Sequence, residues 1–129
     1  MLEGGCACEA IRYRLDAEPY DVGYCHCRMC QRASGAPVLV FATVPRSAFV
    51  VTRGTPRTRR SSSFGDRWWC GDCGTQLAMF VDDDPSEADF TVASLDDPAV
   101  LPPTFHIWTE SRVSWFDTAD QLPRHARRR

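Results

Sequence analysis

The sequence predicts a mainly β protein of one domain whose fold is stapled by zinc. The chain has 129 residues, which suits a single zinc-binding domain spanning 1–129. Its apolar residues occur in short runs, many alternating or β-branched, with turn-forming residues between them. Such spacing is typical of β-rich domains. All seven cysteines fall in three short clusters with spacings that suit a metal ion.

The first third of the chain contains a predicted strand, an extended segment and a short helix. In residues 11–15 apolar side chains alternate with arginines, which predicts a half-buried strand. Residues 20–24 are expected to be extended and to lead into the middle cysteine cluster. Residues 28–34 can form one or two helical turns, and Gly35 directly after them is expected to end the helix.

The rest of the chain continues the β pattern. Residues 38–44 are apolar and β-branched and predict a buried strand, and 49–52 predict another short one. Residues 75–81 form a third apolar run, ended by acidic residues. Phe90, Val92 and Ser94 are expected to line one face of the next strand. Two more strands are expected at 105–108 and 113–116. The arginines 127–129 at the end are expected to fray.

Charge and hydropathy exclude two classes of partner. The formal net charge is -2, so the sequence predicts no nucleic-acid binding. Arg57, Arg59 and Arg60 form a small basic patch that is better explained as a solvated strand face. No apolar run approaches the length that spans a membrane, and the first residues do not resemble a secretory signal. We therefore expect a cytoplasmic protein, in which clustered cysteines more often bind metal than form disulfides.

Cysteine spacing divides the seven sulfurs into two unequal groups. Cys25, Cys27 and Cys30 are close in sequence and make a natural three-sulfur site. The remaining four, Cys6, Cys8, Cys70 and Cys73, then form a four-sulfur site that ties the N-terminus to the middle of the chain. Four sulfurs suit a structural zinc, whereas three leave one position for water or a substrate. The spacing also allows a second division, in which Cys6 and Cys8 join part of the middle cluster.

Two further features of these sites follow from local geometry. A glycine directly after Cys73 suits a tight turn with positive φ. His26 lies between Cys25 and Cys27, and alternation predicts that its side chain points away from their metal. Sequence does not separate zinc from a single iron at an all-thiolate site.

Seven stretches together carry a family resemblance over nearly the whole chain. They are Gly5 to Cys8, the strand at Ile11 to Tyr13, Cys25 to Arg32, Ser34 to Pro37, Cys70 to Thr75, Pro103 to Trp108, and Ser111 to Trp115. They resemble the glutathione-dependent formaldehyde-activating enzyme family, whose domain is shared with the centromere protein V group. The resemblance implies an Mss4-like complex β-sheet fold and two zinc ions per chain. It implies a structural zinc on the four-cysteine set and a second, activity-associated zinc on the three-cysteine set.

The activity that the resemblance implies is the condensation of glutathione with formaldehyde to S-(hydroxymethyl)glutathione, a carbon–sulfur lyase reaction. The three-cysteine zinc would hold the thiol as a thiolate for addition to formaldehyde or another small carbonyl. Arg28 and Arg32 are candidates for binding a carboxylate of the thiol substrate. His106 is a candidate for a general acid or base that contacts the substrate. The alternative is a non-enzymatic, zinc-stapled module that binds a protein or small molecule.

Tryptophans are the remaining candidates for the wall of a substrate pocket. The sequence offers Trp68, Trp69, Trp108 and Trp115 beside the motifs described above. Core packing is the competing explanation for each of them.

Overall fold

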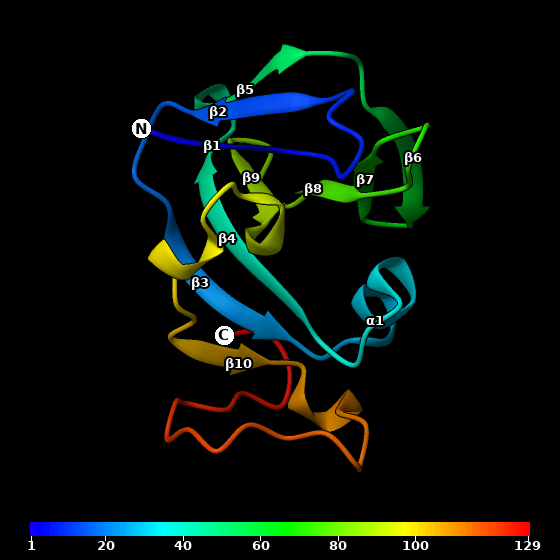
Figure 1. Cartoon of the computed structure of the whole chain (residues 1–129). Helices are drawn as coiled ribbons and strands as arrows, with labels where there is room; N and C mark the ends of the chain where they lie inside the picture. Colours follow the sequence, from blue (N-terminus) through cyan, green and yellow to red (C-terminus); the bar gives the residue numbers. More distant parts are fainter.

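Two β-sheets form the framework of the computed structural model, which describes all residues from 1 to 129 (Figure 1). The smaller sheet has three strands in the order β1 (Leu2–Gly5), β2 (Arg12–Leu15) and β5 (Phe49–Arg53). The strands of the larger sheet follow in spatial order: β10 (Phe105–Ile107), β3 (Tyr20–Cys25), β4 (Leu39–Pro45), β9 (Glu87–Thr91), β8 (Gln76–Val81), β7 (Gly65–Trp69) and β6 (Arg57–Ser62). The mainly β class expected from the sequence is confirmed.

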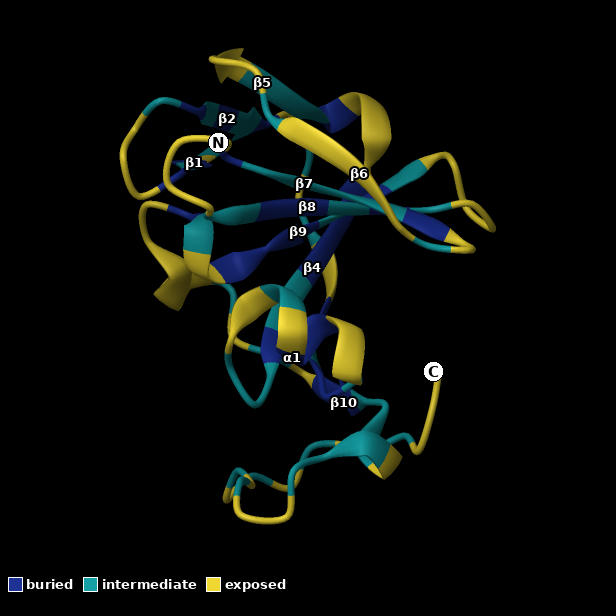
Figure 2. Ribbon diagram, turned by 90° about the vertical axis from the view of Figure 1, so that its right-hand side faces the viewer, coloured by how far each residue is buried: buried dark blue, intermediate teal, exposed yellow.

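The core lies where the two sheets face each other. Tyr13 of β2 is buried, stacks on Phe49 of β5 with ring centroids 4.7 Å apart, and approaches Phe90 of β9 at 6.3 Å. Ile11 and Leu15 are buried with it, as the alternation with arginines predicts. Figure 2 shows the buried residues concentrated in this interior, whereas β6 at the sheet edge is exposed.

One short helix, α1 (Arg28–Ser34), connects β3 to β4. Its N-cap is Cys27, whose sulfur accepts the backbone N–H of Cys30 at 3.3 Å. It ends at Gly35, which adopts φ 66, a left-handed conformation that glycine takes without steric penalty. The predicted helix and its stop are therefore confirmed.

Two expected strand segments are wrong in detail. Strand β9 ends at Thr91, and 92–94 form a 3-10 turn, because the Ser94 hydroxyl donates to the Thr91 carbonyl at 2.7 Å and draws the chain out of the ladder. Residues 113–116 form no strand. Instead, Arg112 Nη1 donates hydrogen bonds to the backbone carbonyl of Val113 at 3.2 Å and to that of Phe116 at 2.6 Å.

The C-terminal segment folds back against β10, which pairs in parallel with β3 at the sheet edge (Figure 1). His106 N–H donates to the Pro123 carbonyl at 2.8 Å, and Trp108 N–H donates to that of Arg127 at 3.1 Å. The expected fraying of the last residues stays a prediction. No helix in the structure has both the length and the apolar character needed to cross a bilayer.

Candidate metal centres

The seven cysteines form two separate sulfur groups in the structure. One contains the Sγ atoms of Cys6, Cys8, Cys70 and Cys73, and the other those of Cys25, Cys27 and Cys30. Within each group all sulfurs lie within 4.8 Å of one another. The folded chain therefore has the first of the two divisions that the spacing allows, and both groups can hold a metal ion.

The four-cysteine group joins the turn after β1 to the turn between β7 and β8. Cys6 Sγ lies 3.6 Å from Cys8 Sγ, which lies 3.7 Å from Cys70 Sγ. Tetrahedral zinc with bonds of about 2.3 Å requires sulfurs roughly 3.8 Å apart, so this group fits zinc. Gly74, with φ 82, makes the predicted positive-φ turn after Cys73.

Backbone N–H groups point at the sulfurs of the four-cysteine group. Ile11 N–H donates to Cys6 Sγ at 3.2 Å, and Asp72 N–H donates to Cys70 Sγ at 3.4 Å. A hydrogen bond with the Thr75 side chain lowers the pKa of Cys73 to about 5. Sulfurs held as acceptors in this way are suited to the thiolate form that binds metal.

The three-cysteine group lies where β3 passes into α1. Cys25 is the last residue of β3, Cys27 caps the helix, and Cys30 lies in its first turn. Cys25 and Cys30 are buried beside Leu39, while Cys27 is partly exposed and is the member of the group nearest to solvent. Apolar side chains packed around it are Phe41, Met79, Ile107 and Trp108.

The three sulfurs lie so close together that their pKa values shift in opposite directions. Hydrogen bonds from Cys25 and then Cys30 hold the pKa of Cys27 well below its usual range. The bond with Cys27 raises the pKa of Cys25 in turn. The group therefore favours negative charge on at least one sulfur, as a cation-binding site requires.

Arg67 is a charged neighbour of this group that sequence reasoning did not single out. Its Nη2 donates to Cys30 Sγ at 3.4 Å, and its Nη1 is buried without a hydrogen-bond partner. Arg67 lies in the middle of β7, and Cys30 is 37 positions away in the sequence. No local motif marks such a contact, because the pairing of distant strands creates it.

His26 belongs to a different environment from the cysteines on either side of it. Its ring is fully buried, and Nε2 lies 2.8 Å from Nδ1 of His106 on β10. Its side chain thus points away from the sulfurs, as alternation predicts, and it is in neither sulfur group. Burial, followed by the nearby His106, lowers the pKa of His26.

The three substrate-contact candidates lie in two different settings. Arg28 and Arg32 are exposed on α1, beside the three-cysteine group. His106 is only 1% exposed and is hydrogen-bonded to His26 and Asp120. Solvent access thus favours the two arginines as contacts for an incoming molecule.

Gln31 follows the last cysteine of the three-cysteine group, and the structure gives it a role in fixing the helix that the sequence alone did not indicate. Its buried amide Nε2 donates to the carbonyls of His26 at 2.7 Å and Ser111 at 3.1 Å, and its Oε1 accepts from Arg28. The side chain thereby fixes α1 to the segment after β10. The sequence showed only that a glutamine follows the last cysteine of the cluster, and its burial is seen in the structure alone.

The tryptophans divide between core, site and surface. Trp68 packs on Phe80 with centroids 4.5 Å apart in the main core, and Trp115 is 77% exposed. Trp108 packs against the three-cysteine group and adopts φ 56, which is uncommon for a bulky residue. Trp69, at the end of β7, is partly buried, and Trp108 is the tryptophan that packs against the three-cysteine group and is placed to form a wall of that site.

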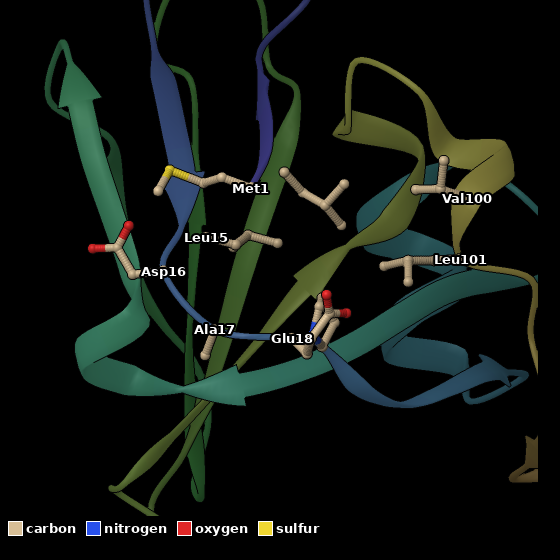
Figure 3. A pocket seen from close by; sticks show the side chains of 9 residues that line it. Met1, Leu15, Asp16, Ala17, Glu18, Val100 and Leu101 are labelled. Atoms are coloured by element: carbon tan, nitrogen blue, oxygen red, sulfur yellow. The ribbon is translucent and has the colours of Figure 1, made fainter.

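The structure also contains a cavity of about 380 Å³ (Figure 3). It is formed by the N-terminus, the end of β2 and the segment around Leu101, with Met1 and Leu15 among its lining side chains. No cysteine lines it. The sulfur groups and this cavity are therefore separate features.

Comparison with known proteins gives consistent matches. The family model described as glutathione-dependent formaldehyde-activating enzyme matches residues 1–111. A Halomonas elongata protein whose name carries the same family designation is 25% identical over 126 residues, covering 91% of this chain and 80% of its own length. An uncharacterized lyase of Schizosaccharomyces pombe is 31% identical over 75 residues, covering 58% and 54%. The crystal structure of a Rhodobacter sphaeroides protein superposes with a TM-score of 0.63 at 19% identity, covering 95% of this chain and 98% of that one, and so shares the fold.

Proposed function

Because the chain belongs to the glutathione-dependent formaldehyde-activating enzyme family, we propose that it is a zinc-dependent carbon–sulfur lyase that adds a glutathione-like thiol to formaldehyde or another small carbonyl. The observation that carries the proposal is the inequality of the two sulfur groups. Cys6, Cys8, Cys70 and Cys73 bring four sulfurs together, enough for a tetrahedral zinc, while Cys25, Cys27 and Cys30 bring only three, so a zinc held there would have a fourth place for a substrate.

The two groups would have different tasks. The four-cysteine group would hold a structural zinc that joins the N-terminal turn to the turn between β7 and β8. The three-cysteine group would hold the second zinc. Bound there, zinc would favour the thiolate form of a substrate thiol near neutral pH.

Residues around the three-cysteine group are suited to admit and orient such a thiol. Cys27 is partly exposed and gives access, while Leu39 and Trp108 reduce the access of water on the inner side. Arg28 and Arg32 are exposed on the same helix and can pair with the carboxylates of glutathione. Their positions favour an anionic thiol over a neutral one.

The reaction itself requires little beyond a positioned thiolate. The substrate sulfur donates an electron pair to the carbonyl carbon and forms the C–S bond, and the C=O π pair moves to oxygen. Solvent then protonates that oxygen to give the hydroxymethyl thioether, and the proton lost by the thiol balances the one gained. Orientation of two small reactants is the main contribution expected of the protein.

Thiols condense with formaldehyde without a catalyst, so the test must compare the rate with the protein against this spontaneous rate. Exchange rates between free and hydroxymethylated glutathione should be measured by NMR with and without the zinc-loaded protein. We expect a protein-dependent increase that Cys27→Ser abolishes while the circular dichroism spectrum stays native. Glutathione binding with no rate above background would favour the non-enzymatic binding module instead. Absence of both binding and rate would contradict the proposal.

A further inference from the structure

The guanidinium of Arg67 faces the three-cysteine group from the large sheet. Arg67 is opposite Met79 on β8 and Arg59 on β6, and Met79 packs against the cysteine group. Directly opposed residues of antiparallel strands project from the same face of the sheet. The contact of Arg67 Nη2 with Cys30 Sγ at 3.4 Å is therefore supported by the strand register.

Arg67 has no carboxylate to balance its charge. None of the ion pairs in the structure includes it, and its Nη1 is buried with no acceptor. The residue directly opposite on β6 is another cation, Arg59, and like charges facing each other across strands are destabilising. A partly buried cation in this setting is costly unless a negative group lies beside it.

The only hydrogen-bond partner of the Arg67 side chain is the sulfur of Cys30. Three thiolates around a divalent ion carry a net charge of -1, which matches the single positive charge of one arginine. Backbone N–H groups donate to sulfurs in both groups, from Ile11 and Asp72 in the four-cysteine group and from Cys30 to Cys27 Sγ in the three-cysteine group. Only the three-cysteine group also receives a hydrogen bond from an arginine. A guanidinium donor thus distinguishes the three-cysteine group from its structural counterpart.

We propose that Arg67 is the positioning residue of the three-cysteine site. Its Nη2 donates to Cys30 Sγ and orients that sulfur, and its charge balances the metal–thiolate group. The proposal rests on the proposed metal site, but it is independent of which thiol or carbonyl reacts there. Donors that hydrogen-bond to metal ligands typically govern metal affinity as well as ligand orientation.

Cobalt(II) provides a readout that does not depend on turnover. The variants are Arg67→Met, Arg67→Lys and the control Arg59→Met, which removes a neighbouring cation that makes no hydrogen bond to sulfur. Each protein is titrated with cobalt while sulfur-to-cobalt charge-transfer absorption is recorded, and affinity is measured by competition with a chelator. The four-cysteine site serves as an internal reference in every sample.

We expect Arg67→Met to weaken binding at the three-cysteine site by about 10- to 100-fold and to leave the four-cysteine site unchanged. The charge-transfer band of the weakened site should move to lower energy, because a sulfur without its hydrogen bond donates electrons more readily. Arg67→Lys should restore part of the affinity, because it keeps the charge but lacks the planar fork. Arg59→Met should match the parent protein.

Equal affinity and band position in Arg67→Met and the parent would overturn the role of Arg67 while leaving the metal site intact. Uptake of a single cobalt by the parent protein would overturn the metal site and with it this inference. Should Arg67→Met fail to fold, Arg67→Lys decides: a parent-like affinity and band position there would contradict the positioning role, and a weaker, shifted site would support it.

Discussion

The imidazole Nε2 of His26 lies 2.8 Å from Nδ1 of His106, and this contact joins the residue that follows β3 to β10. Nε2 of His106 lies 3.2 Å from an Asp120 carboxylate oxygen. A carboxylate accepts, so we assign the His106 proton to Nε2 and the bridging proton to His26 Nε2. His26 Nδ1 then remains an acceptor, and it is buried without a partner. The chain of three side chains holds the C-terminal segment against the sheet.

Replacing His106 tests the stabilising role of this chain. His106→Leu should lower the free energy of unfolding by about 1–3 kcal/mol, because the buried His26 donor loses its partner. Urea unfolding followed by circular dichroism measures the change. Asp120→Asn is the matched control, because its amide oxygen still accepts from His106 and the loss should be smaller. A His106→Leu protein as stable as the parent would contradict the role assigned to the chain.

The protonation of Asp89 should make the stability of the folded protein depend on pH, and the direction of that dependence follows from its pKa. Burial raises its pKa from 3.8 to about 6, while the Thr43 hydroxyl donates to it at 2.6 Å. The folded state therefore binds this proton more tightly than the unfolded state does. The resulting stabilisation is present below pH 3.8 and is lost as pH rises through about 6.

Asp89→Asn should remove that dependence. At about pH 8 the variant should be more stable than the parent, by on the order of 1–3 kcal/mol, because the amide oxygen still accepts from Thr43 and carries no charge. Paired urea unfolding curves at about pH 5 and about pH 8 isolate the effect from other titrating groups. A variant less stable than the parent at the higher pH would contradict this account.

Metal removal should affect the two sulfur groups unequally. Cys8 and Cys70 are 62 positions apart, so a metal on the four-cysteine group closes a long loop and contributes directly to folding. We expect Cys70→Ser or a strong chelator to lower the thermal unfolding midpoint substantially. Cys27→Ser should lower it much less, because Cys25, Cys27 and Cys30 are local in sequence. Equal losses in the two variants would contradict the division into structural and substrate sites.

Local sequence patterns predicted the elements that depend on local physics. Alternation identified the strand at 11–15, and Gly35 marked the end of α1. Short cysteine spacings indicated two sulfur groups, because loop closure favours neighbours. The strand, the helix end and the three-cysteine group need no knowledge of distant partners, whereas the four-cysteine group was inferred from the cysteines that remained.

Features created by distant contacts were not predictable in the same way. Arg67 meets Cys30 across 37 positions, and His26 meets His106 across 80 positions. The strand expected at 113–116 is absent because Arg112 captures the carbonyls of that segment. Each case depends on a tertiary contact that outweighs local propensity.

The most direct test of the central claim is whether the three-cysteine metal accepts a thiol. The protein loaded with two cobalt ions should be titrated with glutathione while the sulfur-to-cobalt charge-transfer absorption is followed. We predict a saturable increase, as expected for a fourth sulfur donor, which is absent in Cys27→Ser and unchanged in the control Arg59→Met. A spectrum that stays constant at saturating glutathione, with both cobalt ions bound, would contradict the claim that this site binds the substrate thiol.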